Sequence, residues 1–238
     1  MDIEEIIISA PEEMGVMLKE SYDYNSKFIE TREQQKYLER IIQAMRLVDR
    51  RFFVNEFPYL NIALGIGHGQ TISQPLTVAR MLMLLNIKPG NNILEIGTGS
   101  GWNAALLAWL AYSGKVVSIE KIPELTQQAQ GNLTAFKDYL KKTNPGGIKK
   151  FSTLKLIVQD FLEIRTEKEL YDRIIFTAGI SNEKTKKAIE NSAQRLLKKD
   201  GRLIAPYISG PISIYYKKNK DEIVVNKTEE LYSFVPIQ

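Results

Sequence analysis

Three glycines separated by single residues, Gly97, Gly99 and Gly101, form the segment best suited to hold a ligand. They follow an apolar run at residues 92–96, which is typical of a buried strand. Glycine has no Cβ, so this loop can adopt positive φ and let the backbone approach a ligand closely. Glu120 ends the next apolar run, about 20 residues further on, where a carboxylate can accept hydrogen bonds from both hydroxyls of a ribose. The loop and the distal carboxylate together predict a nucleoside site.

The spacing of the glycines narrows the class of ligand. Dinucleotide sites have the pattern G-x-G-x-x-G, which brings a pyrophosphate to a helix N-terminus. Here the pattern is G-x-G-x-G, and Trp102 stands where the last glycine would be. This is a poorer fit for a pyrophosphate and disfavours a nicotinamide-dependent dehydrogenase, whereas Glu120 suits the adenosine of either a dinucleotide or S-adenosylmethionine. Asp160, after the third strand, is expected to help hold the adenine, and Glu95 is expected near the cofactor's amino-acid end.

The remaining polar residues suit methyl transfer to a carboxylate. There is no cysteine, one histidine (His68), and no cluster of His, Asp and Glu with metal-ligand spacing, so we expect no metal and no thiolate nucleophile. A carboxylate, with a reference pKa of about 4, is already ionised at neutral pH and needs no general base. Ser73 is expected to donate a hydrogen bond to it and to cap the helix that begins beside Pro75. His68 is expected to be a loop residue.

The elements that would position these residues alternate along the chain. We expect strands at 92–96, 115–120, 154–158, 173–176 and 201–205, with helices at 102–112, 123–139 and 183–197. Alternation of this kind predicts an α/β fold: a doubly wound, Rossmann-like, mostly parallel sheet with helices on both faces. Three further runs, at 212–216, 222–225 and 231–235, lack intervening helices and predict an antiparallel C-terminal edge.

We expect a single methyltransferase domain at residues 31–238, comprising a helical substrate-side segment (31–90) and the cofactor-binding core (91–238). Within the first part, helices are expected from Thr31 to Asp49, with a Thr31/Gln34 capping box, and from Ser73 to the stop at residues 88–90. Residues 52–66 and 143–151 are expected to be loops. Residues 1–30 are an extension without a clear structural pattern.

Charge and hydropathy limit the choice of partners. The formal net charge of +4 comes from short lysine pairs without interleaved aromatic residues, so we expect solvated faces and no nucleic-acid partner. A mildly positive field would still favour an anionic substrate. No apolar run approaches the roughly 18 residues that span a bilayer, so no membrane association is expected. The acidic start and the lack of cysteine lead us to expect a cytoplasmic protein, and we expect it to act as a monomer.

Residues 65–75, which read Gly-Ile-Gly-His-Gly-Gln-Thr-Ile-Ser-Gln-Pro, resemble the signature that precedes the cofactor loop in protein-L-isoaspartate O-methyltransferases. The resemblance continues at residues 94–101, 117–120, 171–175, 201–206 and 234–237 and covers roughly residues 32–238. The glycine loop is shared by many methyltransferases, whereas the Gly-Gln-Thr-Ile-Ser-x-Pro run is much more particular to this family.

The resemblance implies methylation of the free carboxylate of L-isoaspartyl residues in damaged proteins and peptides, with S-adenosyl-L-homocysteine as the second product. The ester would return through a succinimide to aspartate. It implies that Ser73 is the active-site hydroxyl and that Thr71, Val235 and Pro236 help bind the peptide. The implied cofactor-binding residues are Gln70, Thr71, Ile72, Glu95, Gly97, Thr98, Gly99, Ser100, Gly101, Glu120, Lys121, Asp160 and Phe161.

Three segments depart from the family pattern: Gln159-Asp160-Phe161 in place of Gly-Asp-Gly, residues 76–78 where histidines are usual, and residues 177–179 in place of Thr-Ala-Ala. The second departure leaves open a methyltransferase that acts on a different peptide or small-molecule carboxylate. The first leaves open a non-catalytic module that binds a nucleoside without transferring a methyl group.

Overall fold

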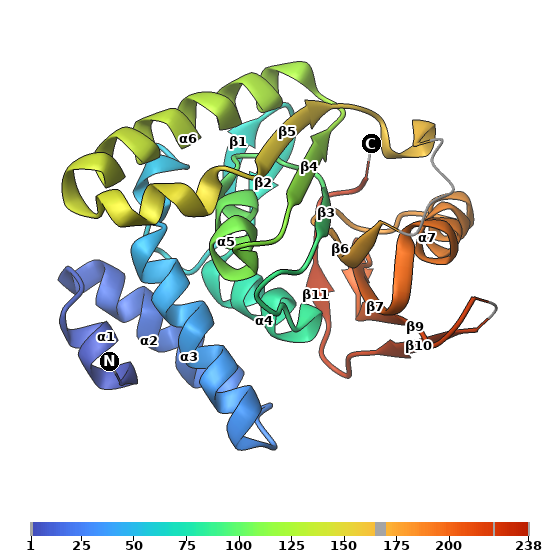
Figure 1. Ribbon diagram of the computed structural model, residues 1–238, viewed down its shortest axis with the longest axis horizontal. Coiled ribbons are helices and arrows are strands. Elements are labelled where there is room, and N and C mark those ends of the chain that lie inside the picture. The colour runs from blue at the N-terminus through green and yellow to red at the C-terminus, as the bar shows by residue number, and fades with distance from the viewer. Residues whose placement is uncertain (1, 165–169, 221, 238) are drawn as a thin grey trace.

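A seven-stranded sheet forms the centre of the computed structural model, which describes residues 2–164, 170–220 and 222–237 (Figure 1). In spatial order the strands are β10 (Ile223–Lys227), β9 (Ile212–Lys217), β7 (Leu197–Pro206), β6 (Tyr171–Phe176), β3 (Ile93–Ile96), β4 (Val116–Glu120) and β5 (Leu154–Val158). Five of them, from β7 to β5, are mutually parallel, and β9 runs antiparallel to both β7 and β10. The predicted doubly wound α/β fold with an antiparallel C-terminal edge is confirmed.

The order of the strands determines where a ligand can bind. From β3 the chain continues to β4 and β5 on one side and later returns to β6 and β7 on the other, so the strand order reverses between β3 and β6. In open α/β sheets, the crevice at such a reversal lies at the carboxyl ends of the strands and is the usual ligand site. The residues that follow β3, β4 and β6 are therefore brought to one place.

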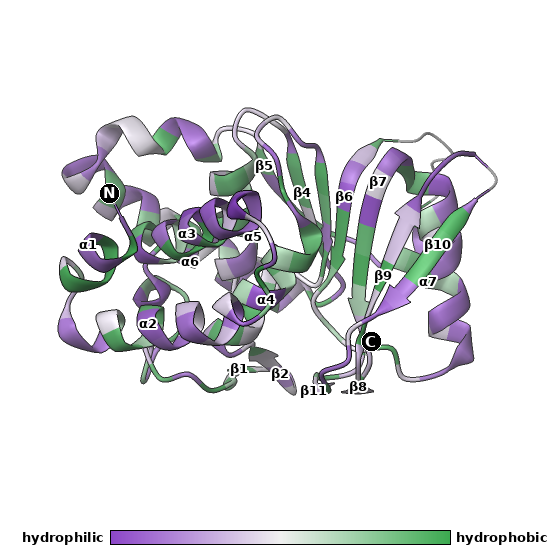
Figure 2. Ribbon diagram, turned by 90° about the horizontal axis from the view of Figure 1, so that it is seen from below, coloured by the Kyte–Doolittle hydropathy of each residue, from purple (hydrophilic) through white to green (hydrophobic). Residues whose placement is uncertain are grey.

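Both faces of the sheet are covered, as Figure 2 shows, but unequally. Successive residues of a strand point to opposite faces, so Ile93 joins the larger core and Leu94 the smaller. The larger core lies under α3 (Arg32–Leu47), α4 (Pro75–Leu85), α5 (Trp102–Ala111) and α6 (Pro123–Thr143). The smaller core lies under α7 (Glu183–Leu196). The helix expected after Thr31 is present as α3. It begins with the expected capping box, in which the main-chain amide of Gln34 donates to the Thr31 hydroxyl at 3.2 Å.

The first 30 residues, in which the sequence shows no clear pattern, contain two helices, α1 (Ile3–Ile8) and α2 (Glu12–Ser26). Met17 and Leu18 of α2 are fully buried in the larger core. Asn25, also in α2, donates from Nδ2 to the carbonyl oxygen of Leu76 at 3.1 Å. The extension thus packs against the substrate-side segment. Its many polar residues explain why the sequence does not indicate a buried face there. Among the described residues, no helix is both long enough and apolar enough to cross a membrane.

Other local expectations need correction. The last expected tail strand is short: β11 (Tyr232–Ser233) pairs with β8 (Ser209–Gly210) in a separate small sheet. A 3-10 helix at Pro145–Phe151 replaces the loop expected there, because Phe151 is buried against the core. Helix α4 ends before residues 88–90, since Asn86 adopts a left-handed conformation with φ of 52°. Within residues 52–66, expected to be a loop, a hairpin begins: β1 (Leu64–Gly67) pairs with β2 (Gln70–Ile72).

Candidate active site

The glycine loop between β3 and α5 has the conformation that its sequence predicts. Gly97, Gly99 and Gly101 have φ values of 96°, 52° and 87°, which L side chains rarely adopt. A Cβ at Gly97 would lie 2.3 Å from the hydroxyl oxygen of Thr177, at the end of β6. A Cβ at Gly99 would lie 3.3 Å from Ile66 of the β1–β2 hairpin. The loop is therefore enclosed between β6 and the hairpin.

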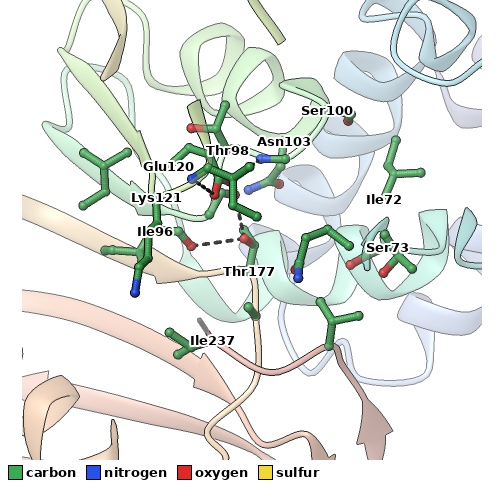
Figure 3. Close-up of a pocket in the computed structure, with 18 of the residues that line it drawn as sticks. Ile72, Ser73, Ile96, Thr98, Ser100, Asn103, Glu120, Lys121, Thr177 and Ile237 are labelled. Atoms are coloured by element: carbon green, nitrogen blue, oxygen red, sulfur yellow. Dashed lines mark hydrogen bonds between the residues drawn. The ribbon is translucent and has the colours of Figure 1, made fainter. Parts of the chain in front are cut away.

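A hollow lies over this loop, and we call it the glycine-loop hollow. Figure 3 shows Glu120 and Lys121 on one side, Ile72 and Ser73 on the other, and Thr177 between them. Its wall contains the predicted residues Gln70, Thr71, Ile72, Ser73, Gly97, Thr98, Gly99, Ser100, Glu120, Lys121, Asp160, Phe161, Val235 and Pro236. Segments from β2 to the C-terminal tail thus meet at the carboxyl ends of β3, β4 and β6.

Two predicted cofactor residues lie outside this wall. Gly101 faces α6, where a Cβ would lie 3.1 Å from the Cβ of Ala129, so this glycine allows α5 and α6 to pack closely. Glu95 is fully buried beneath the loop. Its carboxylate accepts from Asn103 Nδ2 at 2.7 Å and from the Ser118 hydroxyl. Burial raises the pKa of Glu95 to about 8, although both hydrogen bonds oppose that shift. Glu95 is linked to the hollow indirectly, through Asn103 and through Ser118 to Thr98, and both Asn103 and Thr98 line the hollow.

Glu120 is placed as the sequence predicts. Its side chain is 8% exposed, and its two oxygens accept from the amides of Gly99 at 3.0 Å and Ile122 at 3.1 Å. Each carboxylate oxygen has a second lone pair, so Glu120 can still accept hydrogen bonds from two hydroxyl groups. The two amides fix the carboxylate in position, which is the arrangement that a ribose site needs.

Asp160 and Phe161 form the far wall of the hollow. Asp160 pairs with Lys121 at 3.1 Å and accepts from the amide of Leu162 at 3.0 Å. Phe161 is buried and makes an edge-to-face contact with Phe176, with ring centroids 5.3 Å apart. A polar group beside an aromatic wall suits a planar base that carries an amino group.

Ser73 differs from its expectation in one respect. The N-cap residue of α4 is Gln74, and its side chain makes no capping hydrogen bond. The amide of Leu76 instead donates to Oδ1 of Asn61 at 3.1 Å, so a preceding loop supplies the cap. The predicted capping role of Ser73 is therefore wrong. Its hydroxyl makes no hydrogen bond to any other residue that the structure describes, and it lines the hollow.

A second hollow, the serine hollow, adjoins the first. Its lining consists of Ala63, Thr71, Ser73, Gln74, Thr77, Thr177, Leu231, Tyr232, Ser233, Phe234 and Val235. Four of these residues, Thr71, Ser73, Thr177 and Val235, also line the glycine-loop hollow. The tail is held here because the Gly179 amide donates to the carbonyl of Val235 at 2.7 Å. Two ligands, one in each hollow, could thus contact the same four residues.

The family model described as protein-L-isoaspartate(D-aspartate) O-methyltransferase matches residues 23–238. The chain belongs to this family. A protein-L-isoaspartate O-methyltransferase of Fervidobacterium nodosum is 37% identical over 206 residues, which is 84% of this chain and 94% of the relative. One from Pyrococcus horikoshii is 34% identical over 230 residues, 92% of this chain and 94% of that one.

The isoaspartate methyltransferase family also includes a similar crystal structure. A Plasmodium falciparum chain described as a member of the family, in complex with S-adenosyl-L-homocysteine, has a TM-score of 0.69 at 23% identity. The match covers 92% of this chain and 97% of that one, and it shows a shared fold.

Several residues that line the glycine-loop hollow are absent from the sequence predictions, notably Thr177, Asn103 and Ile237. Thr177 donates to the carbonyls of Ile96 at 3.1 Å and Gly97 at 2.7 Å, and so joins β6 to the glycine loop. Its place directly after a parallel strand is the signal that could have identified it. Among the described residues, no three His, Asp or Glu side chains gather in a way that could hold a metal ion.

Proposed function

We propose that this protein transfers a methyl group from S-adenosylmethionine to the free carboxylate of L-isoaspartyl residues in proteins and peptides. One observation carries the proposal: two hollows meet at a wall that contains Ser73. A group-transfer enzyme must bring donor and acceptor together in this way, and orientation alone supplies up to roughly 7–11 kcal/mol in favourable models. Family membership identifies the acceptor.

The residues of the glycine-loop hollow fit the donor. Glu120 would accept hydrogen bonds from the ribose hydroxyls, and the loop at Gly97 and Gly99 leaves no Cβ between backbone and ligand. Asp160 and Phe161 would hold the adenine. When bound, S-adenosylmethionine would supply a methyl group on its sulfonium: the carboxylate oxygen would bond to the methyl carbon as the carbon–sulfur bond breaks, and the sulfur would leave with the electron pair. S-adenosyl-L-homocysteine is then the second product.

The serine hollow would hold the peptide. An isoaspartyl carboxylate is ionised at neutral pH, so the protein needs only to orient it and exclude water. The Ser73 hydroxyl donates to one carboxylate oxygen, and Thr71 and Val235 confine the side chain. His68 is exposed at the hairpin turn with φ of 53° and lines neither hollow, which agrees with a mechanism without a histidine base.

A matched pair of peptides tests the proposal. The protein is incubated with methyl-labelled S-adenosylmethionine and an isoaspartyl peptide, beside the same peptide with a normal aspartyl residue. We expect label in the isoaspartyl peptide alone, as a base-labile ester. Equal labelling of both peptides would indicate a different carboxylate substrate. Binding of S-adenosyl-L-homocysteine with no transfer to either would indicate a non-catalytic module.

We also propose that the protein acts as a monomer and without nucleic acid, since residues of one chain line both hollows. We propose that residues 31–238 form the methyltransferase domain and that α2 supports its substrate side through Asn25. Light scattering tests the first point, and deletion of residues 1–30 the second. The cytoplasmic location stays a prediction that cell fractionation tests.

A further inference from the structure

Arg50 is an arginine side chain that is fully buried, with an exposed fraction of 0%. One guanidinium nitrogen donates to the carbonyls of Pro58 at 2.8 Å and Leu60 at 3.4 Å. The other donates to those of Ile62 at 3.4 Å and Ser73 at 3.1 Å. The hydrogen bonds of this one side chain thus connect the loop before β1 to Ser73, the residue proposed to contact the substrate.

The charge of Arg50 has no carboxylate partner among the described residues. Its neighbour Asp49 pairs with Arg51 at 3.0 Å instead. The guanidinium lies over the ring of Trp102, 5.3 Å from the centroid, which offers partial compensation. Burial lowers the pKa of Arg50 to about 10, so the group is still protonated at neutral pH. Burial of a cation carries a desolvation penalty, so a protein is often equally stable or more stable with an apolar side chain of similar volume in its place. This points to a role beyond packing.

The loop that is bound by Arg50 also contacts the helix that follows Ser73. Asn61 lies between the carbonyls of Leu60 and Ile62, and its Oδ1 accepts from the amide of Leu76 in the first turn of α4. Ser73 is therefore held directly through its carbonyl and indirectly through the start of the helix that follows it.

We propose that Arg50 is the positioning residue of the active site: it fixes the main chain of Ser73 and places a positive charge behind the substrate carboxylate. The inference rests on the proposed function of Ser73. It predicts a defect mainly on the peptide side, because the hydrogen bonds of Arg50 go to the loop before β1 and to Ser73, although the Trp102 ring that it covers lines the glycine-loop hollow. Misplacement of a contact group by about 1 Å can lower a rate by about 100-fold.

The test compares Arg50→Met, which keeps the volume without donors, and Arg50→Lys, which keeps the charge but reaches fewer carbonyls. Arg40→Met is the matched control, since Arg40 also donates to a carbonyl (Leu110, 3.1 Å) and stacks on an aromatic ring (Tyr37, 5.5 Å). For each, kcat and KM for the isoaspartyl peptide are measured, together with the affinity and stoichiometry of S-adenosyl-L-homocysteine.

For Arg50→Met we expect kcat/KM for the peptide to fall by about 100-fold with a raised KM, while the affinity for S-adenosyl-L-homocysteine changes far less. Arg50→Lys should show a smaller loss of the same kind and keeps the test valid if the methionine variant does not fold. Arg40→Met should match the wild type. If the substitution only reduced the amount of folded protein, the stoichiometry of S-adenosyl-L-homocysteine binding would fall and KM for the peptide would not change. That result would overturn the inference, and so would normal peptide kinetics in Arg50→Lys. An inactive wild type would instead refute the proposed function.

Discussion

The two hollows are built in different ways although they share a wall. The glycine-loop hollow is formed mainly by short segments that follow four neighbouring parallel strands, β6, β3, β4 and β5, and main-chain amides fix Glu120. The serine hollow joins β2 and the start of α4, which are close in sequence, to the distant tail at Leu231–Val235. Its surroundings are held by side chains across long separations, such as the Arg80–Glu230 ion pair at 3.1 Å. The cofactor side follows from the topology of the sheet, whereas the substrate side depends on individual side chains.

The largest effect should come from the shared wall. Ser73→Ala removes the hydroxyl proposed to contact the substrate and should lower kcat by about 100-fold, comparable to the loss of one oxyanion-hole donor. Calorimetry should show unchanged affinity for S-adenosyl-L-homocysteine. Ser192→Ala, whose hydroxyl donates to a carbonyl within α7, is the control and should have wild-type kinetics. Unchanged turnover in Ser73→Ala would mean that the substrate carboxylate lies elsewhere.

On the cofactor side, Glu120→Ala should weaken binding of S-adenosyl-L-homocysteine by about 1–3 kcal/mol, since hydrogen bonds to a charged group are lost. KM for the peptide should change little. Glu124→Ala, at an exposed position in the first turn of α6, serves as the control in the same calorimetry. A defect in peptide binding with normal cofactor affinity would contradict the division between the two hollows.

Gly97→Ala tests the backbone conformation of the loop. The new Cβ would collide with the Thr177 hydroxyl, and a positive φ costs an L-residue about 1–2 kcal/mol. We expect both the melting temperature and cofactor affinity to fall. Gly131→Ala, in the open middle of α6, should instead raise stability by about 0.5–1 kcal/mol. Equal effects of the two substitutions would show that the loop is not constrained.

Glu95, beneath the glycine loop, should make stability depend on pH. Its pKa rises on folding from an ordinary 4.5 to about 8, so between these values the folded protein holds a proton that the unfolded chain has lost. Stability should therefore fall as the pH rises from about 5 to 8 and then level off. Urea unfolding of wild type and Glu95→Gln should show this decline only in the wild type. A wild-type stability that rises relative to the variant over this range would contradict the assignment.

The same contrast explains what the sequence could predict. The glycine pattern indicated the three positive φ values, and the alternation of elements placed Glu120 at a strand end. The cap of α4 was assigned to Ser73 because a serine before proline is a strong local signal, yet Asn61 supplies the oxygen. The role of Arg50 could not be predicted, because its hydrogen-bond acceptors are main-chain carbonyls, which every residue type carries. Helix α2 could not be predicted because it contains few apolar residues.

A crystal structure with S-adenosyl-L-homocysteine and an isoaspartyl peptide tests the central claim most directly. The account predicts ribose hydroxyls on Glu120 in the glycine-loop hollow and the peptide carboxylate in the serine hollow, within hydrogen-bond distance of the Ser73 hydroxyl where the two hollows adjoin. A nucleoside bound outside that hollow, or a carboxylate that approaches from another face, would contradict it.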